Sequence, residues 1–332
     1  MIRRLASFLI IAYRGTAAAL VLSLSLATPA LLPAMAVGAE KPLNSVEIGG
    51  IYMRQANHFS TDGPARIDDL NGKAVTESKT RPFALISLSG KYGDNNLLYL
   101  KTDIEQMDDA NIYLGTEVPL SEKGNRLDIA VFTSPFFGEV WKNPYKTGSD
   151  REETDVIRYG ARVAVRDILG TSLSLSFKAA AFDVDDDEIG RMYSSLRRDG
   201  TVYTLAGEYR VRLTEGLSMT PSLRLTRGDM DGGSNAFDGY SVGIKWMYRK
   251  GDMMVMPLLR YAFVTYDETH PIFNKKREDN HYLGALMATY SNLFGFRGFF
   301  VRIIGGYSAA DSNITFCDGT GKFAGVTVGY RR

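Results

Sequence analysis

The chain has 332 residues, and its 39 lysines and arginines nearly balance 38 aspartates and glutamates, so its charge does not point to a nucleic-acid partner. The lone cysteine, Cys317, excludes a disulfide framework and a cysteine-rich metal site. After residue 40, no window approaches the roughly eighteen uninterrupted apolar residues of a membrane helix, so helical membrane spans are excluded.

The first 39 residues have the pattern of a secretory signal peptide. Arg3, Arg4 and Arg14 precede an apolar run over 16–32, and small-residue patterns follow at 34–36 and 37–39. The sequence therefore predicts a signal peptide over 1–39, cleaved after Ala36 or Ala39, and a mature chain over 40–332. A retained membrane anchor is the alternative, because the run is close to the shortest length that spans a bilayer.

Apolar and polar residues alternate with a period of two along most of the mature chain. In segment 203–213, every second residue is apolar or glycine, and the other face carries Glu208, Arg210 and Arg212. The segments have the length of strands that cross a bilayer at a tilt, about twice that of strands in a soluble sandwich. A lysine or arginine facing lipid costs about 2–4 kcal/mol, which explains why formal charges gather on one face.

This pattern predicts an all-β protein: a closed antiparallel transmembrane β-barrel of about fourteen strands, with twelve or sixteen as alternative counts. Closure is expected because open strand edges would leave backbone groups unpaired in hydrocarbon. Tyrosines near the segment ends would form interfacial girdles. The expected strands span 45–56, 81–92, 96–106, 110–119, 125–134, 155–167, 171–183, 201–213, 217–229, 237–249, 252–266, 280–291, 297–308 and 321–331.

The connections between these strands alternate between tight turns and long loops. An even strand count with short periplasmic turns would place both termini on the periplasmic side of the outer membrane. The long loops are expected at 57–80, 135–154, 184–200, 230–236, 267–279 and 309–320.

Two stretches resemble a known family: SPFFGEVWKNPY at 134–145 and PIFNKKRED at 271–279. With the residues around them, they make the chain similar to the DUF2860 family of Gram-negative outer-membrane proteins. The resemblance implies a porin-like β-barrel and brings no catalytic residues to transfer. One departure is the end of the chain, because such barrels usually finish on an aromatic residue, whereas Tyr330 is followed here by Arg331 and Arg332.

If the apolar face meets lipid, the opposite face lines the interior. Early strands contribute acidic residues and later strands basic ones, which predicts a transverse field and a mild preference for anions. The alternative is that the charges pair internally and fill the bore. The expected pore-lining residues are Asp103, Glu105, Glu117 and Asp128, followed by Arg158, Arg162, Arg166, Lys178, Arg210, Arg212, Arg224, Lys245, Arg260 and Arg302.

Two of the predicted loops have unusual compositions. Phe136, Phe137, Trp141 and Tyr145 lie in the 135–154 loop, which predicts a constriction or plug; packing on the outer rim is the alternative. The acidic residues at 183–188 begin like a calcium loop but lack its turn glycine and closing glutamate, so a solvated acidic loop without a metal is expected, with weak divalent bridging to lipopolysaccharide as the alternative.

The only histidines, His58, His270 and His281, form neither a zinc-protease motif nor the pattern of barrel phospholipases. We therefore expect a porin-like channel for small hydrophilic solutes, without catalytic residues, cofactor or nucleic-acid partner. Its expected partners are outer-membrane lipid, lipopolysaccharide and the barrel assembly machinery. The alternatives are a non-conducting structural or adhesive barrel and, least favoured, a barrel hydrolase using His58 with Asp62, or His270 with neighbouring carboxylates.

Overall fold

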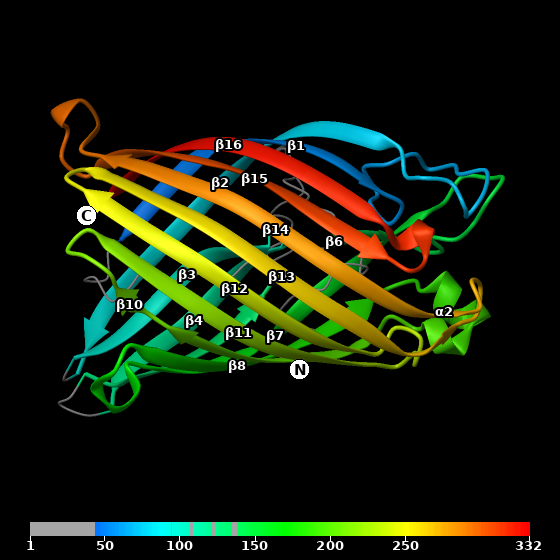
Figure 1. The fold of residues 1–332 in the computed structure, drawn as a ribbon, viewed down its shortest axis with the longest axis horizontal. Coiled ribbons are helices and arrows are strands. Elements are labelled where there is room, and N and C mark those ends of the chain that lie inside the picture. The colour runs from blue at the N-terminus through cyan, green and yellow to red at the C-terminus, as the bar shows by residue number, and fades with distance from the viewer. Residues whose placement is uncertain (1–43, 94, 107–108, 121–123, 135–137) are drawn as a thin grey trace, which may run out of the picture.

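The computed structural model describes residues 44–93, 95–106, 109–120, 124–134 and 138–332. Their strands form one antiparallel sheet that closes on itself (Figure 1). The side chains of 104–106 and 109–110 are not described. The predicted signal peptide, Phe136 and Phe137 lie outside the described residues. Within these residues, no helix is long and apolar enough to cross a membrane.

The strands follow one another around the barrel in chain order. They are β1 (Ser45–Asn57), β2 (Thr76–Tyr92), β3 (Asn96–Gln106), β4 (Asp109–Pro119), β5 (Arg126–Thr133), β6 (Gly138–Trp141), β7 (Glu153–Arg166), β8 (Leu173–Val184), β9 (Gly200–Tyr209), β10 (Val211–Arg212), β11 (Leu217–Met230), β12 (Phe237–Lys250), β13 (Met253–His270), β14 (Lys275–Ser291), β15 (Phe299–Ser312) and β16 (Gly319–Arg331).

Among the described residues, fourteen strands make up the barrel wall, because β10 continues β9 and the short β6 pairs with β7 off the path around the barrel. The barrel closes where β1 pairs with β16, from Ser45 opposite Arg331 to Asn57 opposite Gly319. The predicted closed antiparallel barrel of fourteen strands is therefore confirmed. Closure gives every wall strand two hydrogen-bonded neighbours, which removes the open edges that hydrocarbon would not tolerate.

The two faces of the wall differ in the way that the alternation predicts. On β1, Val46 and Ile48 are exposed on the outside, while Glu47 between them is buried on the inside. The same register holds on the other wall strands, so the outer surface is an apolar band. The predicted girdle tyrosines all expose their rings on this outer face: Tyr52, Tyr92, Tyr159, Tyr203, Tyr248, Tyr290, Tyr307 and Tyr330.

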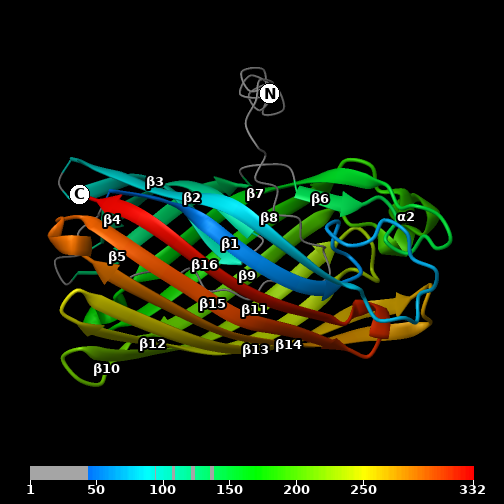
Figure 2. The ribbon, with the colours of Figure 1, turned by 90° about the horizontal axis from the view of Figure 1, so that it is seen from above.

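The two ends of the barrel are built differently, as Figures 1 and 2 show. One end carries the tight turns and the C-terminus, and the other carries the long loops and the short helix α2 (Glu188–Met192). Two of the tight turns repeat one conformation: Asp167 and Asn292 each begin a turn with a positive φ, of 51° and 52°. These short polar side chains tolerate the left-handed region better than most residues, which suits them to such turns.

Several predicted loop boundaries are wrong at the loop end. The predicted 135–154 loop contains β6, which pairs with the start of β7, and the predicted 267–279 loop shrinks to a turn over 271–274. Similarly, β2 begins at Thr76, while β15 and β16 leave only 313–318 between them. Antiparallel pairing continues here beyond the length needed to cross a bilayer, and polar segments outside the lipid no longer need an apolar face. The predicted strand 201–213 is interrupted at Arg210.

Candidate functional site

The predicted pore-lining residues with described side chains lie on inward positions of the wall, alternating with exposed apolar residues. Arg212 differs from the others because it is exposed near the short-turn end, and the side chain of Glu105 lies outside the described part of the chain. The remaining charges fall into groups with different surroundings. These groups, and not the order of charges along the chain, determine the electrostatics of the interior.

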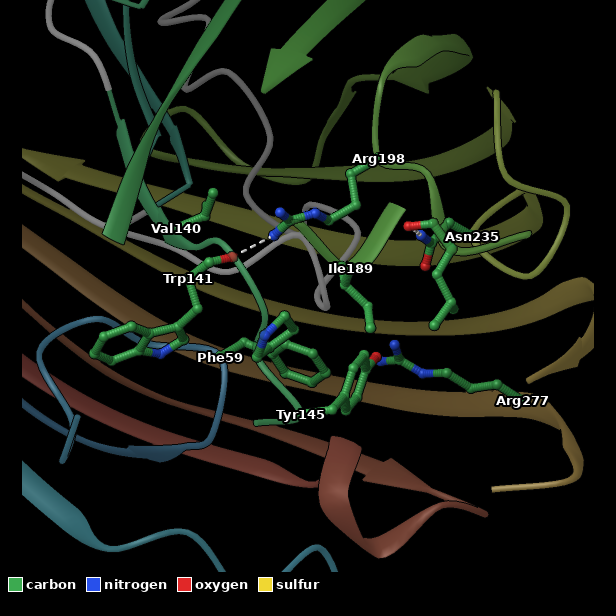
Figure 3. A pocket seen from close by; sticks show the side chains of 10 residues that line it. Phe59, Val140, Trp141, Tyr145, Ile189, Arg198, Asn235 and Arg277 are labelled. Carbon is green, nitrogen blue, oxygen red and sulfur yellow. Dashed lines mark hydrogen bonds between the residues drawn. The ribbon is translucent and has the colours of Figure 1, made fainter. Parts of the chain in front are cut away.

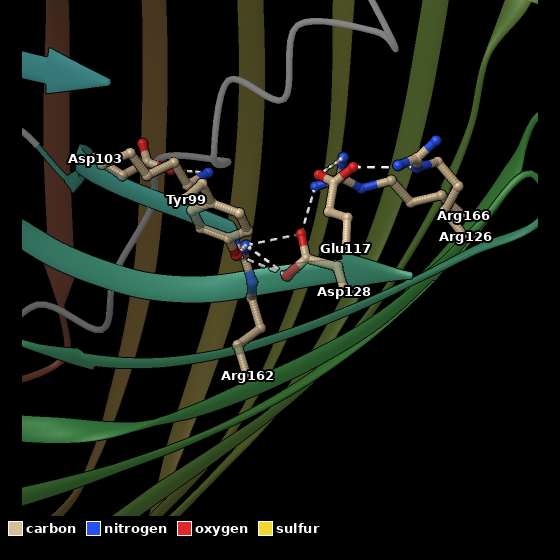
Figure 4. Close-up of polar contacts among 8 residues, drawn as sticks. Tyr99, Asp103, Glu117, Arg126, Asp128, Arg162 and Arg166 are labelled. Carbon is tan, nitrogen blue, oxygen red and sulfur yellow. Dashed lines mark hydrogen bonds and ion pairs between the residues drawn. The ribbon is translucent and has the colours of Figure 1, made fainter. Parts of the chain in front are cut away.

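The first group is a network of ion pairs on β3, β4, β5 and β7, which we call the paired arc (Figure 4). It consists of Tyr99, Glu117, Arg126, Asp128, Arg162 and Arg166. Asp128 is 0% exposed and accepts hydrogen bonds from the Tyr99 hydroxyl at 2.7 Å and from Arg166 Nη2 at 2.7 Å. Arg162 Nη2 lies 3.3 Å from Asp128 Oδ2.

Glu117 extends the paired arc toward the short-turn end. Its two carboxylate oxygens lie 2.8 Å from Arg166 Nη1 and 3.2 Å from Arg126 Nε. Arg166 therefore bridges both carboxylates of the network. Because each carboxylate faces two guanidinium groups, the acidic residues of the early strands are neutralised locally.

Neighbouring cations also have partners in this part of the wall. Arg158 donates to the side-chain oxygen of Asn111 at 2.6 Å, and Lys178 lies over the ring of Phe132 at 4.7 Å from its centroid. Farther around the wall, Arg302 Nη1 contacts both carboxylate oxygens of Glu47 at 2.8 Å. The predicted separation into an acidic arc and a basic arc is therefore wrong for these residues, because strand packing places most of them against acceptors.

The second group is found on β11, β12 and β13 and at the break between β9 and β10, and we call it the basic arc: Arg210, Arg224, Lys245 and Arg260. Glu208 is the carboxylate among them on the inward face. Among the described side chains, no ion pair joins Arg210, Lys245 or Arg260 to a carboxylate. Within the described inner wall, the cations of the basic arc thus outnumber the carboxylate that lies among them.

Solvent reaches part of this inner face. The side chains of Lys101 and Arg302 point inward, yet they keep 25% and 23% of their surface exposed. The inner wall is not uniformly polar, because Ile51, Leu258 and Phe323 belong to a buried apolar cluster contributed by β1, β13 and β16. The interior therefore combines an apolar patch with charged side chains that keep contact with water.

At the loop end, residues from several connections pack into one apolar group, which we call the mouth cluster. Its buried members are Phe59, Ile314, Phe316 and Cys317, and Ile67, Leu70, Tyr145 and Phe273 pack against them. The Tyr145 ring lies between 5.1 and 5.9 Å from the rings of Phe59, His270, Phe273 and Phe316. Burial raises the pKa of the Cys317 thiol to about 12, so it stays protonated at neutral pH.

Arg151 and Arg198 hold the loops of the mouth together. Arg151 donates to the backbone carbonyls of His58, Pro64, Ala65 and Pro144, so it ties the 58–75 connection to the segment that follows β6. Burial lowers the pKa of Arg151 to about 10, which leaves it charged at neutral pH.

Arg198 forms a similar link from the segment before β9. It donates to the carbonyls of Trp141 and Lys142 and pairs with Asp187 at 2.6 Å. Figure 3 shows its guanidinium beside the Trp141 carbonyl, on the edge of a small cavity of about 30 Å³ that Tyr145 and Arg277 also line. The loops thus form an ordered cap.

The structure describes two of the four aromatic residues that were predicted to form a constriction or plug. Trp141 is 2% exposed and Tyr145 belongs to the mouth cluster, while Phe136 and Phe137 lie outside the described residues. Inward-pointing wall residues face this cluster, because the guanidinium of Arg277 on β14 lies 5.9 Å from the Phe59 ring. Trp141 and Tyr145 therefore pack among the loops at the loop end of the barrel, and their role as a constriction stays a prediction.

The predicted solvated acidic loop needs correction at Asp186 and Asp187, whereas Asp183 and Asp185 are exposed. Asp187 caps α2 by accepting from the Gly190 amide and pairs with Arg198, so its side chain is only 12% exposed. Asp186 pairs with Lys142 and Arg191. These carboxylates hold the cap together, and among the described residues no cluster of ligands could hold a metal ion.

The two histidine–carboxylate combinations considered for a hydrolase have other partners. The His58 ring contacts the Gly72 carbonyl at 3.0 Å and stacks on Phe316, while Asp62 pairs with Arg81. His270 Nε2 lies 2.9 Å from the Tyr145 hydroxyl. Each histidine side chain therefore contacts the cap and not its proposed carboxylate.

Sequence reasoning missed several residues of these networks. Glu47, Tyr99 and Arg126 occupy inward positions of their strands, so the alternation itself was the signal that could have found them. Arg151 and Arg198 lie in connections without periodicity. Their partners are distant backbone carbonyls, which leave no pattern in the sequence.

A closed antiparallel barrel with an apolar outer band, a charged inner face, short turns at one end and long loops at the other is the architecture of outer-membrane β-barrel proteins. This is the class of protein that the fold and the inner wall define.

Within this class, the chain belongs to the family described as "Protein of unknown function (DUF2860)", which matches residues 44–331. The resemblance inferred from the two sequence stretches is therefore confirmed. A search of curated proteins returned no match.

Solved structures with similar folds include outer-membrane channels. The outer membrane channel DcaP of Acinetobacter baumannii has 11% identity and a TM-score of 0.45, with coverage of 87% of this chain and 97% of that chain. An outer membrane channel from Pseudomonas putida has 10% identity and a TM-score of 0.47, with coverage of 91% and 100%. A Pseudomonas aeruginosa FadL homologue has 9% identity and a TM-score of 0.46, with coverage of 87% and 90%.

Proposed function

We propose that the protein is a porin-like channel in the outer membrane that allows passive diffusion of small hydrophilic solutes with a mild preference for anions. The main support is the basic arc on the inner wall, where Arg210, Lys245 and Arg260 form no ion pair with any described carboxylate. Rings or arcs of lysine and arginine favour anions in pores. A channel also needs water inside the wall, and the partly exposed, inward-pointing Lys101 and Arg302 meet that requirement.

The mouth cluster would act as the constriction of this channel. Its aromatic rings and the buried Arg151 and Arg198 keep the loops over the end of the barrel, so a solute would meet them before it reaches the basic arc. Constrictions built from loops that fold inward limit solute size, because they narrow the bore more than the wall does.

Planar-bilayer recording of the refolded mature protein tests the channel. We expect discrete conductance steps and, across a KCl gradient, a reversal potential that favours chloride. Absence of steps from correctly folded protein would refute the proposed function. Heat-denatured protein from the same preparation is the control for detergent artefacts.

The packed mouth gives specific support to a second candidate, a structural or adhesive barrel that does not conduct. Deletion of 136–145, which removes Trp141 and Tyr145, distinguishes the two. If the mouth cluster is the constriction, the deletion raises conductance. If the wild type and the deletion variant are both silent, the non-conducting barrel is the correct function.

The orientation and the processing of the chain belong to the same proposal. Ser45 and Arg331 are opposite each other at the short-turn end, so a periplasmic location of that end puts both ends of the sheet in the periplasm. N-terminal sequencing of protein from the outer-membrane fraction should begin at Val37 or Glu40, in agreement with cleavage after Ala36 or Ala39. Intact Met1 would contradict a cleaved signal peptide.

A further inference from the structure

One row of residues crosses the basic arc at a single level of the wall. Glu208 on β9 is opposite Ser222 on β11, Ser222 is opposite Gly243 on β12, and Gly243 is opposite Arg260 on β13. All four residues occupy inward positions. The row therefore places a carboxylate, a hydroxyl, a residue without a side chain and a guanidinium side by side on the inner face.

Arg260 is the unusual member of this row. It is only 6% exposed, and its Nη1 atom is buried without a hydrogen-bond partner. A buried cation that lacks an acceptor is strongly unfavourable compared with one that is paired. The paired arc shows that this wall can supply carboxylates to buried arginines, whereas the Nη1 atom of Arg260 has no acceptor among the described residues.

Gly243 has no side chain, so Ser222 and Arg260 approach the same stretch of backbone. A Cβ atom at this position would lie 2.9 Å from Ser222 Oγ, 3.4 Å from the Leu259 carbonyl oxygen and 3.5 Å from Arg260 Nε. The hydroxyl and the guanidinium therefore converge over the bare backbone of Gly243. Both are hydrogen-bond donors, and together they form a small cradle with two donors and a floor of backbone.

The surrounding charges favour an anion in this cradle. Arg224 is close enough to repel Arg260 electrostatically, and Glu208 is the carboxylate that opposes this repulsion. Arg224 is opposite Ser241, and Lys245 is opposite Thr220, so the neighbouring rows add cations beside small polar side chains. Three basic residues against one carboxylate leave a local excess of positive charge.

We propose that Arg260, Ser222 and Gly243, with Arg224 nearby, form a binding site for a small oxyanion, the phosphate or carboxylate group of a solute inside the barrel. The proposal rests on the proposed function, because the solute reaches the inner wall through the channel. An oxyanion accepts hydrogen bonds from the guanidinium and the hydroxyl at once, which chloride does less well because it has a single acceptor centre.

Isothermal titration calorimetry tests the site on the whole barrel folded in detergent micelles. Inorganic phosphate and succinate are titrated separately at constant ionic strength, with chloride as the background anion. We expect saturable binding of at least one of them, and Arg260→Gln should weaken it about tenfold through loss of a charge-assisted hydrogen bond. Gly243→Ala should weaken it as well, because the added methyl group fills the cradle without changing the charge.

Arg212→Gln is the matched control, because Arg212 is an exposed arginine near the turn end of the same sheet region. This variant should bind as the wild type does. Equal binding by wild type and by both cradle variants would overturn the site, and so would the absence of binding by either anion. Binding of phosphate alone or of succinate alone would identify the oxyanion that the site accepts.

Calorimetry in micelles does not depend on conduction, so the site and the channel can fail separately. Saturable, Arg260-dependent binding in a protein that produces no conductance steps would refute the channel and keep the site. Conductance steps without such binding would refute the site and keep the channel.

Discussion

The paired arc and the basic arc lie on the same inner wall and arise from the same alternation, yet their charges have opposite surroundings. In the paired arc, Asp128 and Glu117 each face two guanidinium groups. In the basic arc, Arg260 is buried with an Nη1 atom that has no hydrogen-bond partner among the described residues, and Glu208 is the carboxylate that opposes the repulsion between Arg260 and Arg224. The difference shows that an inward charge in a barrel can serve either the stability of the wall or the field inside it.

The two roles have different energetic consequences. Removing a partner from a buried ion pair leaves an uncompensated charge, which is strongly destabilising. Removing a cation that has no partner relieves repulsion and changes mainly the potential that a solute meets. Substitutions in the two arcs should therefore separate stability from selectivity.

The largest effect is expected from Asp128→Asn in the paired arc. This change leaves Arg162 and Arg166 without their shared carboxylate, and the free energy of unfolding should fall by about 3–5 kcal/mol. Guanidinium chloride unfolding of the barrel in micelles measures it. Lys245→Gln is the control from the basic arc and should change the free energy of unfolding by less than about 0.5 kcal/mol. An equal decrease in the free energy of unfolding of both variants would show that the two arcs contribute equally to stability, which would contradict the proposed difference between them.

Arg151 lies at the barrel mouth, outside both arcs, and its guanidinium is hydrogen-bonded to backbone carbonyls. Arg151→Met keeps much of the side-chain volume but leaves the carbonyls of His58, Pro64, Ala65 and Pro144 without their donor. We expect the cap to lose about 1.5–3 kcal/mol of stability, the range of a hydrogen bond to a charged group. Limited proteolysis should then cut the 58–75 connection faster, with the wall strands intact. Unchanged cleavage would show that Arg151 does not hold the cap.

The ion selectivity of the channel should depend on the charges in the basic arc. Loss of a cation and loss of the carboxylate should shift it in opposite directions. One unit charge about 10 Å from an ion in water contributes about 0.4 kcal/mol, a factor of about two for each ion and of opposite direction for chloride and potassium. Lys245→Gln should therefore lower the chloride-to-potassium permeability ratio about fourfold, and Glu208→Gln should raise it about fourfold. Reversal potentials in a KCl gradient measure both. Shifts of the same sign would contradict a field set by these residues.

The smallest effect is a pH dependence of the cap. Burial lowers the pKa of His58 below 6.5, and its contact with the Gly72 carbonyl opposes this shift only in part. The unfolded cap then binds the proton more tightly, so stability present above pH 6.5 is lost as the pH falls through the lowered pKa. Proteolysis of the loop end should be faster at pH 5 than at pH 8, and His58→Gln should reduce this difference. A pH-independent rate would exclude His58 as the cause.

Much of the wall was predictable because its signal is local. The apolar positions on either side of Glu47 and the tight turns at Asp167 and Asn292 determine which residues pair and which face the outside. The 135–154 connection is different. A long loop does not determine the register between the two strands that it joins. The sequence therefore could not predict that Arg162 and Arg166 on β7 lie beside Asp128 on β5.

The cap was less predictable than the wall for a related reason. Phe59, Tyr145 and Phe316 come from three connections far apart in the chain, and the buried Arg151 binds backbone carbonyls, which every residue carries. No spacing or residue pattern marks such contacts. The aromatic content of 135–154 indicated a packed loop, but the sequence left open whether it lay in the mouth or on the rim.

By itself, the sequence determined the barrel. Lipid around the wall requires an apolar side chain at every second residue of each strand, which gives the sequence a period of two, and backbone hydrogen bonding in lipid requires the sheet to close. Only the tertiary structure decided which inward charges neutralise one another and which, like Arg260, remain without a carboxylate. Whether two inward charges pair depends on the register of neighbouring strands and on distances of a few ångströms between side chains. These distances are set by the closed wall and cannot be obtained from the order of residues.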